Sequence, residues 1–181
     1  DDNPVLSVAF SPDGQQILTG SKNETIRLWD VARGNEIRNW NGHRDGDTSV
    51  VFHVGFSPDG RRVLSAGRLG TATQLWDSNT TRELRRFEGK TGRASSVAFS
   101  PDGGQLLIAG NKSARLWDVA AGREIRRFDT PWGMYSVAFS PDGRYILTGQ
   151  YRIARLWETA TGAEIRAFEQ AKYRAEIYSV A

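Results

Sequence analysis

The octapeptide Ser-Val-Ala-Phe-Ser-Pro-Asp-Gly occupies residues 7–14 and returns unchanged at residues 96–103 and 136–143. A variant, His-Val-Gly-Phe-Ser-Pro-Asp-Gly, occupies residues 53–60. Ser-Pro-Asp-Gly therefore starts at positions 11, 57, 100 and 140, so the intervals are 46, 43 and 40 residues. A repeat with intervals of this length predicts a protein built from tandem copies of one small structural unit.

Each octapeptide predicts a β-hairpin. Val8 and Phe10 alternate with Ser7 and Ala9, a period of two that is typical of a strand. Ser-Pro-Asp-Gly then has the composition of a turn, because proline fixes φ and Gly14 accepts a positive φ. We interpret the aspartates between proline and glycine as turn residues rather than as a metal or acid–base site. They are Asp13, Asp59, Asp102 and Asp142.

The remainder of each repeat predicts two further strands. The third strand ends on Leu-Trp followed by an acidic residue, and the fourth begins with a glutamate, an aliphatic residue and an arginine. The tryptophans of the third strands are Trp29, Trp76, Trp117 and Trp157. Each repeat therefore predicts four short antiparallel strands.

This pattern resembles the WD repeat of β-propellers, in which four strands recur about every 40–45 residues and Trp-Asp ends the third strand. The Gly-His pair that precedes a unit in that family occurs once, as Gly42-His43. The resemblance implies an all-β fold of four-stranded antiparallel blades at about residues 5–42, 43–88, 89–129 and 130–169, with the start of a fifth at 170–181. The near-identical repeats are similar to those of prokaryotic WD-repeat proteins, which often carry signalling modules such as kinases.

Well-formed blades of that family contain a buried hydrogen-bond network of His, Ser or Thr, Asp and Trp. In this sequence the tryptophan persists together with a hydroxyl on the second strand, and Ile108-Ala109 lacks even the hydroxyl. Those hydroxyl residues are Thr19, Ser65 and Thr148. We therefore expect apolar contacts between neighbouring blades to hold the structure together. In the second repeat His43 is expected to bridge Ser65 and Trp76.

The last residues, 177–181, align with residues 134–138 and thus with the beginning of another repeat. We expect the chain to be part of a propeller whose ring is completed either by further blades or by a second chain. Two four-blade chains related by a two-fold axis would form a homodimer with eight blades.

Composition narrows the functional classes. The chain has 181 residues and no cysteine, which excludes a disulfide, a thiolate zinc site and a cysteine nucleophile. It contains no signal peptide and no apolar run of membrane length, and these features slightly favour a cytoplasmic location. The two histidines, His43 and His53, form no ligand or catalytic pattern. We predict no catalytic residue, no metal and no cofactor, and hence no enzyme.

Twenty arginines and a net charge of +3 keep a basic nucleic-acid-binding surface as an alternative. This alternative is less favoured, because four outer-strand arginines each follow a glutamate by two residues. The positive charge of each arginine is therefore expected to be compensated by that glutamate. These arginines are Arg38, Arg85, Arg126 and Arg166. Three others, each two residues before a repeat tryptophan, are expected to stack on the indole. They are Arg27, Arg115 and Arg155.

The main hypothesis is a non-catalytic scaffold for protein–protein interaction. In a propeller, the loops between blades and the turns between second and third strands lie on one face, and their non-repeating residues are candidates for partner binding. The candidates are Lys22, Arg44, Arg68, Leu69, Trp132, Met134, Tyr151, Arg152 and Tyr173. Trp132 either belongs to an aromatic and arginine-rich binding patch or packs against its own loop or the channel mouth. A half-propeller that binds a second copy of itself is the other alternative.

Overall fold

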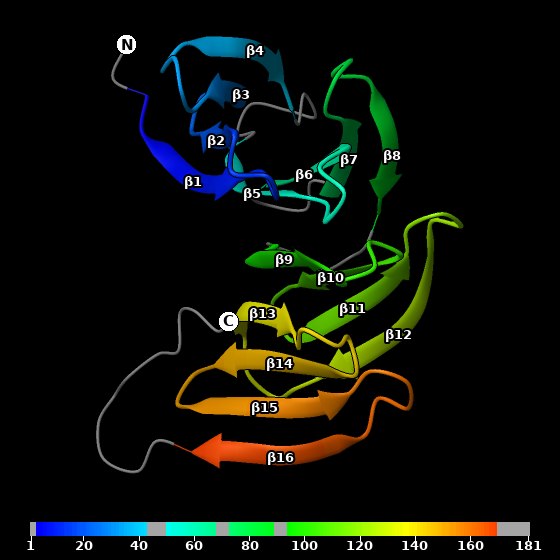
Figure 1. The fold of residues 1–181 in the computed structure, drawn as a ribbon. Helices are drawn as coiled ribbons and strands as arrows, with labels where there is room; N and C mark the ends of the chain where they lie inside the picture. The colour runs from blue at the N-terminus through cyan, green and yellow to red at the C-terminus, as the bar shows by residue number, and fades with distance from the viewer. Residues whose placement is uncertain (1–2, 43–49, 68–72, 89–93, 170–181) are drawn as a thin grey trace. The chain divides into compact units, whose positions relative to one another are not determined.

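The computed structural model describes residues 3–42, 50–67, 73–88 and 94–169. These residues form sixteen strands arranged as four separate antiparallel sheets of four strands each (Figure 1). The strands of every sheet pair in chain order, as expected for WD-type blades. Within the described residues no helix is long and apolar enough to cross a membrane.

The four sheets are called blades 1 to 4 in chain order. Blade 1 contains β1 (Val5–Phe10), β2 (Gln16–Ser21), β3 (Thr25–Asp30) and β4 (Glu36–Asn41). Blade 2 contains β5 (Val51–Phe56), β6 (Arg62–Gly67), β7 (Thr73–Asp77) and β8 (Glu83–Phe87). Blade 3 contains β9 (Ser96–Phe99), β10 (Gln105–Ala109), β11 (Ser113–Asp118) and β12 (Arg123–Asp129). Blade 4 contains β13 (Met134–Phe139), β14 (Tyr145–Gln150), β15 (Ile153–Glu158) and β16 (Glu164–Glu169).

The chain divides into two compact units. Residues 1–94 contain blades 1 and 2, and residues 95–181 contain blades 3 and 4. Each unit therefore holds one pair of neighbouring blades, and each pair has its own hydrophobic core.

The octapeptide forms a hairpin turn at the predicted place. In the first copy the Gly14 amide donates to the Ser11 carbonyl at 2.9 Å, and Gly14 has a φ of 70°. The Ser11 hydroxyl and the Gln15 amide both donate to Asp13 Oδ1, at 2.6 and 3.0 Å. The same contacts recur at the other three copies, which confirms that these aspartates are turn residues.

Apolar side chains fill the space between the two blades of each unit. In the second unit, Leu116 and Phe128 of blade 3 pack with Val137 and Trp157 of blade 4. The rings of Phe128 and Trp157 meet edge-on with centroids 5.6 Å apart. The first unit has the equivalent arrangement, in which Trp40 and Trp76 lie 6.3 Å apart. These clusters confirm the expectation of apolar contact between neighbouring blades.

The serine of the octapeptide joins neighbouring blades. The Val54 amide of blade 2 donates to Ser7 Oγ of blade 1 at 3.1 Å, and the Val137 amide of blade 4 donates to Ser96 Oγ of blade 3 at 3.3 Å. In the second blade His53 replaces this serine. The octapeptide thus encodes both a hairpin and a hydrogen bond to the next blade.

Candidate functional site

The predicted loop residues of blade 4 lie at one end of the β13–β14 pair. Met134 at the start of β13 pairs with Gln150 at the end of β14, so Trp132 before β13 and Tyr151 after β14 share that end. The loop that carries Trp132 lies against the turn between β10 and β11, because the Thr130 amide donates to the Lys112 carbonyl at 2.9 Å. The strand register and the loop contacts thus bring three connections of the second unit together: the β10–β11 turn, the β12–β13 loop and the β14–β15 turn.

Trp132 is 56 % exposed, so its indole does not pack under its own loop. The Thr130 hydroxyl donates to the Trp132 carbonyl at 2.8 Å and holds the loop backbone in place. Tyr151 and Arg152 are half-buried, Lys112 is exposed, and Arg152 has a φ of 63° in the left-handed region. We call the residues Lys112, Trp132, Tyr151 and Arg152 the Trp132 patch.

Met134 is buried, contrary to its prediction as a surface residue. It lies in the core between blades 3 and 4, because β13 begins at Met134 and turns its side chain toward blade 3. Lys22 is exposed in the turn between β2 and β3 of the first unit. The other predicted loop residues lie outside the described residues, as does His43. These loop residues are Arg44, Arg68, Leu69 and Tyr173.

The tryptophans of the third strands bind hydroxyl groups of the second strands. Trp29 Nε1 donates to Thr19 Oγ1 at 3.0 Å, and the same bond joins Trp76 to Ser65 and Trp157 to Thr148, at 2.9 and 3.0 Å. In blade 3 the equivalent position beside Trp117 is Ile108, which has no hydroxyl to offer. These bonds orient the indole rings within the blades.

The arginines of the third strands form ion pairs with the glutamates of the fourth strands. Arg115 Nη1 lies 2.8 Å from Glu124 and Arg155 Nη1 lies 2.7 Å from Glu164, and the first blade has the equivalent pair at 3.2 Å. The pairing register places each glutamate opposite the tryptophan two residues after the arginine, so the two charged side chains share a face. The structure thus directs these guanidinium groups to carboxylates rather than to indole rings.

Arg126 was expected to be compensated by Glu124, two residues earlier, and this expectation is wrong. Its guanidinium instead donates to the carbonyls of Ala160 and Thr161 in blade 4, at 2.7 and 2.6 Å. Glu124 is paired across the sheet with Arg115, which leaves Arg126 to reach the neighbouring blade. The outer-strand arginine is therefore a contact between blades.

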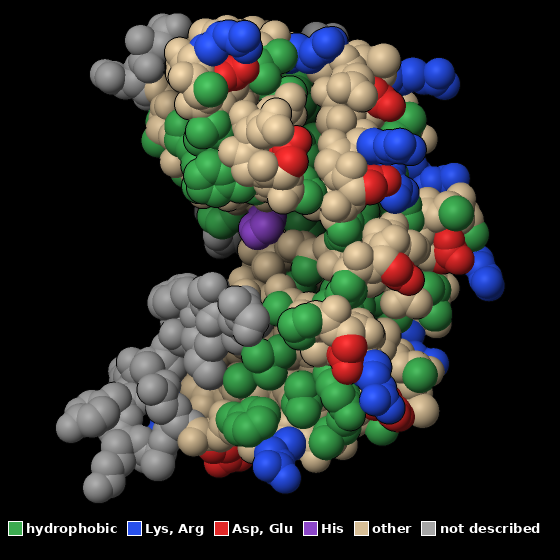
Figure 2. Space-filling model, viewed as in Figure 1, with side chains coloured by type: hydrophobic (Ala, Val, Ile, Leu, Met, Phe, Trp, Pro, Cys, Tyr) green, Lys and Arg blue, Asp and Glu red, His purple; other side chains and the backbone are tan. Residues whose placement is uncertain are grey.

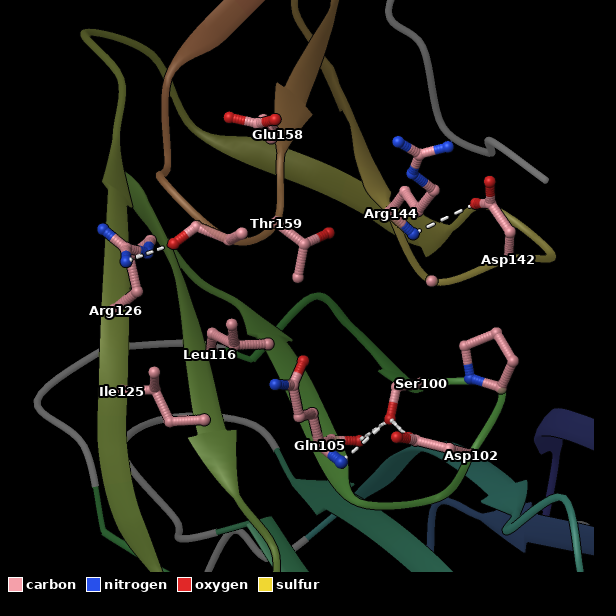
Figure 3. A pocket seen from close by; sticks show the side chains of 13 residues that line it. Ser100, Asp102, Gln105, Leu116, Ile125, Arg126, Asp142, Arg144, Glu158 and Thr159 are labelled. Carbon is pink, nitrogen blue, oxygen red and sulfur yellow. Dashed lines mark hydrogen bonds between the residues drawn. The ribbon is translucent and has the colours of Figure 1, made fainter.

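A groove opens between blades 3 and 4 of the second unit, beside their Ser-Pro-Asp-Gly turns (Figure 3). Its volume is about 590 Å³, within the range of ligand-binding clefts. Leu116 and Ile125 provide apolar lining, and Asp102 and Asp142 lie near one end. Serine hydroxyl and backbone N–H donors lower the pKa of both aspartates, so both are ionised at neutral pH.

Blades 1 and 2 form the equivalent groove in the first unit, with a volume of about 250 Å³. At one equivalent position, Ser78 Oγ of the smaller groove donates to the Gly60 carbonyl at 2.9 Å, whereas Thr159 Oγ1 of the larger groove has no hydrogen-bond partner among the described residues. Sequence reasoning missed both grooves, because it treated this end of the repeat as invariant turn chemistry. The residue after each Trp-acidic pair varies between repeats and was the available signal.

The described residues contain no group of three or more His, Cys, Asp and Glu side chains placed to hold a metal ion. His53 lies on β5 and is half-buried, and desolvation lowers the pKa of its imidazole. Its Nδ1 has no hydrogen-bond partner in the described part of the chain. His53 is therefore a strand residue and belongs to no such metal-ligand group among the described residues.

Tandem four-stranded antiparallel sheets, each with a tryptophan near the end of its third strand, define a repeat protein of the β-propeller class. The chain belongs to the family described as WD domain, G-beta repeat, which matches residues 1–30, 34–77, 81–118 and 122–158. Each matched segment ends at the acidic residue after the repeat tryptophan. Domains of this family are typically non-catalytic scaffolds.

Several curated proteins are similar to this chain. The U3 small nucleolar RNA-associated protein 15 homolog of Xenopus tropicalis is 28 % identical over 126 residues, 67 % of this chain and 22 % of that protein. Protein groucho of Drosophila melanogaster is 27 % identical over 129 residues, 71 % of this chain and 17 % of that protein. Transducin-like enhancer protein 2 of Mus musculus is 26 % identical over 129 residues, 71 % of this chain and 16 % of that protein. The chain thus spans less than a quarter of the length of these relatives.

Proposed function

We propose that this chain is a non-catalytic scaffold that binds a protein partner through the Trp132 patch. The observation that carries the proposal is the exposure of Trp132 beside half-buried Tyr151 and Arg152, at an end of blade 4 that the repeat does not dictate. Tryptophan, tyrosine and arginine are the residue types most enriched at interaction hot spots. Arg44, Arg68, Leu69 and Tyr173 remain predicted contributors from neighbouring loops.

The backbone supports this surface. Strand pairing fixes the positions of Trp132 and Tyr151, and the Thr130 contacts fix the loop between them and the turn that carries Lys112. A partner therefore meets side chains whose backbone is already ordered, which reduces the entropy cost of binding. A partner segment with carboxylates next to an apolar or aromatic side chain fits the two cations and two aromatic rings of the patch.

Nucleic-acid binding receives less support from the arginines. Arg115 and Arg155 are ion-paired with glutamates, and Arg126 is bound to backbone carbonyls. Cations held in this way contribute less to binding phosphates than free ones. One relative is named for association with small nucleolar RNA, so this alternative merits a direct test. Retention on heparin that falls steeply with added salt would favour it.

The test is a peptide-display selection on the purified chain, with Trp132→Ala as the counter-selection target. The proposal predicts enriched peptides that carry acidic and apolar residues and that lose at least tenfold in affinity for the Trp132→Ala protein. Ile165→Ala, which removes an exposed apolar side chain on the outer strand of blade 4, is the matched control and should leave binding unchanged. Peptides that bind both variants equally well would contradict the proposal.

A further inference from the structure

The groove between blades 3 and 4 contains a buried hydroxyl group that lacks a partner. Thr159 lines this groove and is only 9 % exposed. Its Oγ1 makes no hydrogen bond within the described residues, and Figure 3 shows its side chain pointing toward the middle of the groove. Because buried hydroxyl groups are normally hydrogen-bonded, this one indicates that a polar group from outside the chain belongs here.

Two aspartates at one end of the groove each keep a carboxylate oxygen available. In both Asp102 and Asp142, a serine hydroxyl and a backbone amide donate to Oδ1, at distances from 2.5 to 3.0 Å. These bonds hold each carboxylate in its turn and leave Oδ2 to accept from a ligand. One end of the groove therefore presents two negative charges, one from each blade.

The other charged side chains that line the groove are engaged or directed elsewhere. The Glu158 carboxylate accepts from the Thr161 hydroxyl, and the Arg126 guanidinium donates to two carbonyls of blade 4. The guanidinium of Arg144 points away from Asp102 in Figure 3. Figure 2 shows acidic and basic side chains interspersed over the described part of the second unit. The negative charge at the end of the groove is therefore a local feature.

The equivalent groove between blades 1 and 2 satisfies the corresponding polar groups from within the chain. The Ser78 hydroxyl donates to a backbone carbonyl, and Asp59 forms an ion pair with Arg62 at 3.8 Å. Asn79 lines this smaller groove where Ala160 lines the larger one. Because the two grooves share the same turns, the larger volume and the unpartnered hydroxyl distinguish the second unit.

We propose that the groove between blades 3 and 4 binds an arginine side chain in a segment of a protein partner. The guanidinium would lie against Asp102 and Asp142 and donate to Thr159 Oγ1. The methylene groups of the arginine would pack on Leu116 and Ile125, the apolar lining of the groove. This site is separate from the Trp132 patch, and the proposal does not depend on the function proposed for that patch.

Arginine fits these groups because of its shape and its donors. A guanidinium has five N–H donors in a planar fork, so it can donate to two carboxylates and to a hydroxyl at the same time. Its stem packs on apolar surface while its charged head stays at the polar end. The groove volume of about 590 Å³ is large enough for a ligand of several groups, so residues next to the arginine in the partner segment would occupy the remainder.

The experiment is an NMR titration of the isotope-labelled chain with the capped peptide acetyl-Gly-Ala-Arg-Ala-Gly-amide. The Gly104 and Arg144 amides, which donate to the two aspartates, should shift and saturate. A matched peptide with citrulline in place of arginine keeps the shape without the charge, and it should cause no such shift. The Gln15 and Arg61 amides, at the equivalent turns of the first unit, should not respond to either peptide.

Three variants test the groups assigned to the site. Asp102→Asn should weaken binding of the arginine peptide about tenfold, as expected for loss of a charged hydrogen bond, and Thr159→Val about fivefold. Ala160→Asn introduces the side chain found in the smaller groove and should also weaken binding. Asp13→Asn makes the same change as Asp102→Asn in the first unit, and it should leave the affinity unchanged.

Four results would overturn the proposal. They are unchanged Gly104 and Arg144 amides in the unmodified chain, equal binding of the arginine and citrulline peptides, full affinity of Asp102→Asn, and equal weakening by Asp13→Asn. The last result would show that the peptide responds to the overall charge of the chain rather than to this groove. The spectrum of each variant without peptide checks that the variant is folded.

Discussion

β1 and β13 each contain the first half of one copy of the octapeptide. The two strands differ in burial rather than in local structure. Both run into a turn in which a serine hydroxyl and a backbone amide donate to the aspartate. Both pair with the second strand in the same register. Yet Val137 lies in the core while Val8 is exposed, because blade 3 precedes β13 and no described blade of its unit precedes β1.

The difference separates two kinds of information in a repeat. Local sequence sets the strand, the turn and the register, because proline, glycine and alternation act over a few residues. The neighbouring blade sets burial, because a sheet face becomes a core only when another sheet covers it. Equivalent substitutions in the two regions should therefore have equal effects when they alter the turn and unequal effects when they alter the face.

The largest expected difference is between Phe128→Ala and Phe168→Ala. Removing the buried Phe128 ring leaves a cavity between blades 3 and 4 and should lower the free energy of unfolding by about 3–5 kcal/mol. Removing the exposed Phe168 ring should lower it by less than about 1 kcal/mol in dilute, unassociated protein. Urea unfolding followed by tryptophan fluorescence measures both values, and equal losses would contradict the assigned burial.

Val137→Ala and Val8→Ala make the same comparison on the first strands of blades 4 and 1. Val137→Ala should cost about 2 kcal/mol, from the lost transfer free energy and the cavity. Val8→Ala should cost less than about 0.5 kcal/mol in dilute protein, because the side chain is already in water. Thermal unfolding of the two variants at low concentration is the measurement. A loss of stability for Val8→Ala as large as that for Val137→Ala would contradict the difference in burial between the two side chains.

A smaller difference is expected for the hydroxyl groups that bind tryptophan. Thr148→Val leaves Trp157 Nε1 buried without its acceptor and should cost about 1–3 kcal/mol. Thr19→Val should cost below about 1 kcal/mol, because Trp29 is half-buried and its indole N–H can turn to water. The control is Ile108→Val in blade 3, where no such hydrogen bond exists to be lost. Equal effects of the two threonine substitutions would show that burial does not decide their size.

Asp13→Asn and Asp142→Asn should differ least. Serine hydroxyl and backbone amide donors lower the pKa of both carboxyl groups in the folded chain. A lowered folded pKa stabilises the fold above the unfolded pKa of about 3.9, and this contribution is lost as the pH falls through the folded pKa. Each variant should therefore melt below the parent at pH 7 and approach it in acid. Melting temperatures against pH should give two matching curves, and a curve that differs between the variants would contradict a purely local origin.

Much of the fold could be predicted from the sequence. The four copies of Phe-Ser-Pro-Asp-Gly and the recurring Leu-Trp predict the strands and blades, because these signals are local and repeated. The ion pairs of Glu36 and Glu124 were assigned to the wrong arginines, because the partner depends on the register between strands three and four. Met134 was misplaced because a position just after a loop can face either the surface or the core.

The candidate site was less predictable than the blades. Trp132 was identified because it breaks the repeat, but only the structure distinguished an exposed indole from one packed on its loop. The groove around Thr159 was missed, since it forms from turns of two blades that are identical in most positions. Surfaces shared by two blades depend on packing that no single repeat encodes.

Hydroxyl-radical footprinting of Phe128 and Phe168 tests the central claim most directly, because it reads the exposure of two equivalent side chains in one sample. In dilute protein, Phe168 should be oxidised several times faster than Phe128. Equal oxidation rates at the two rings would contradict the account.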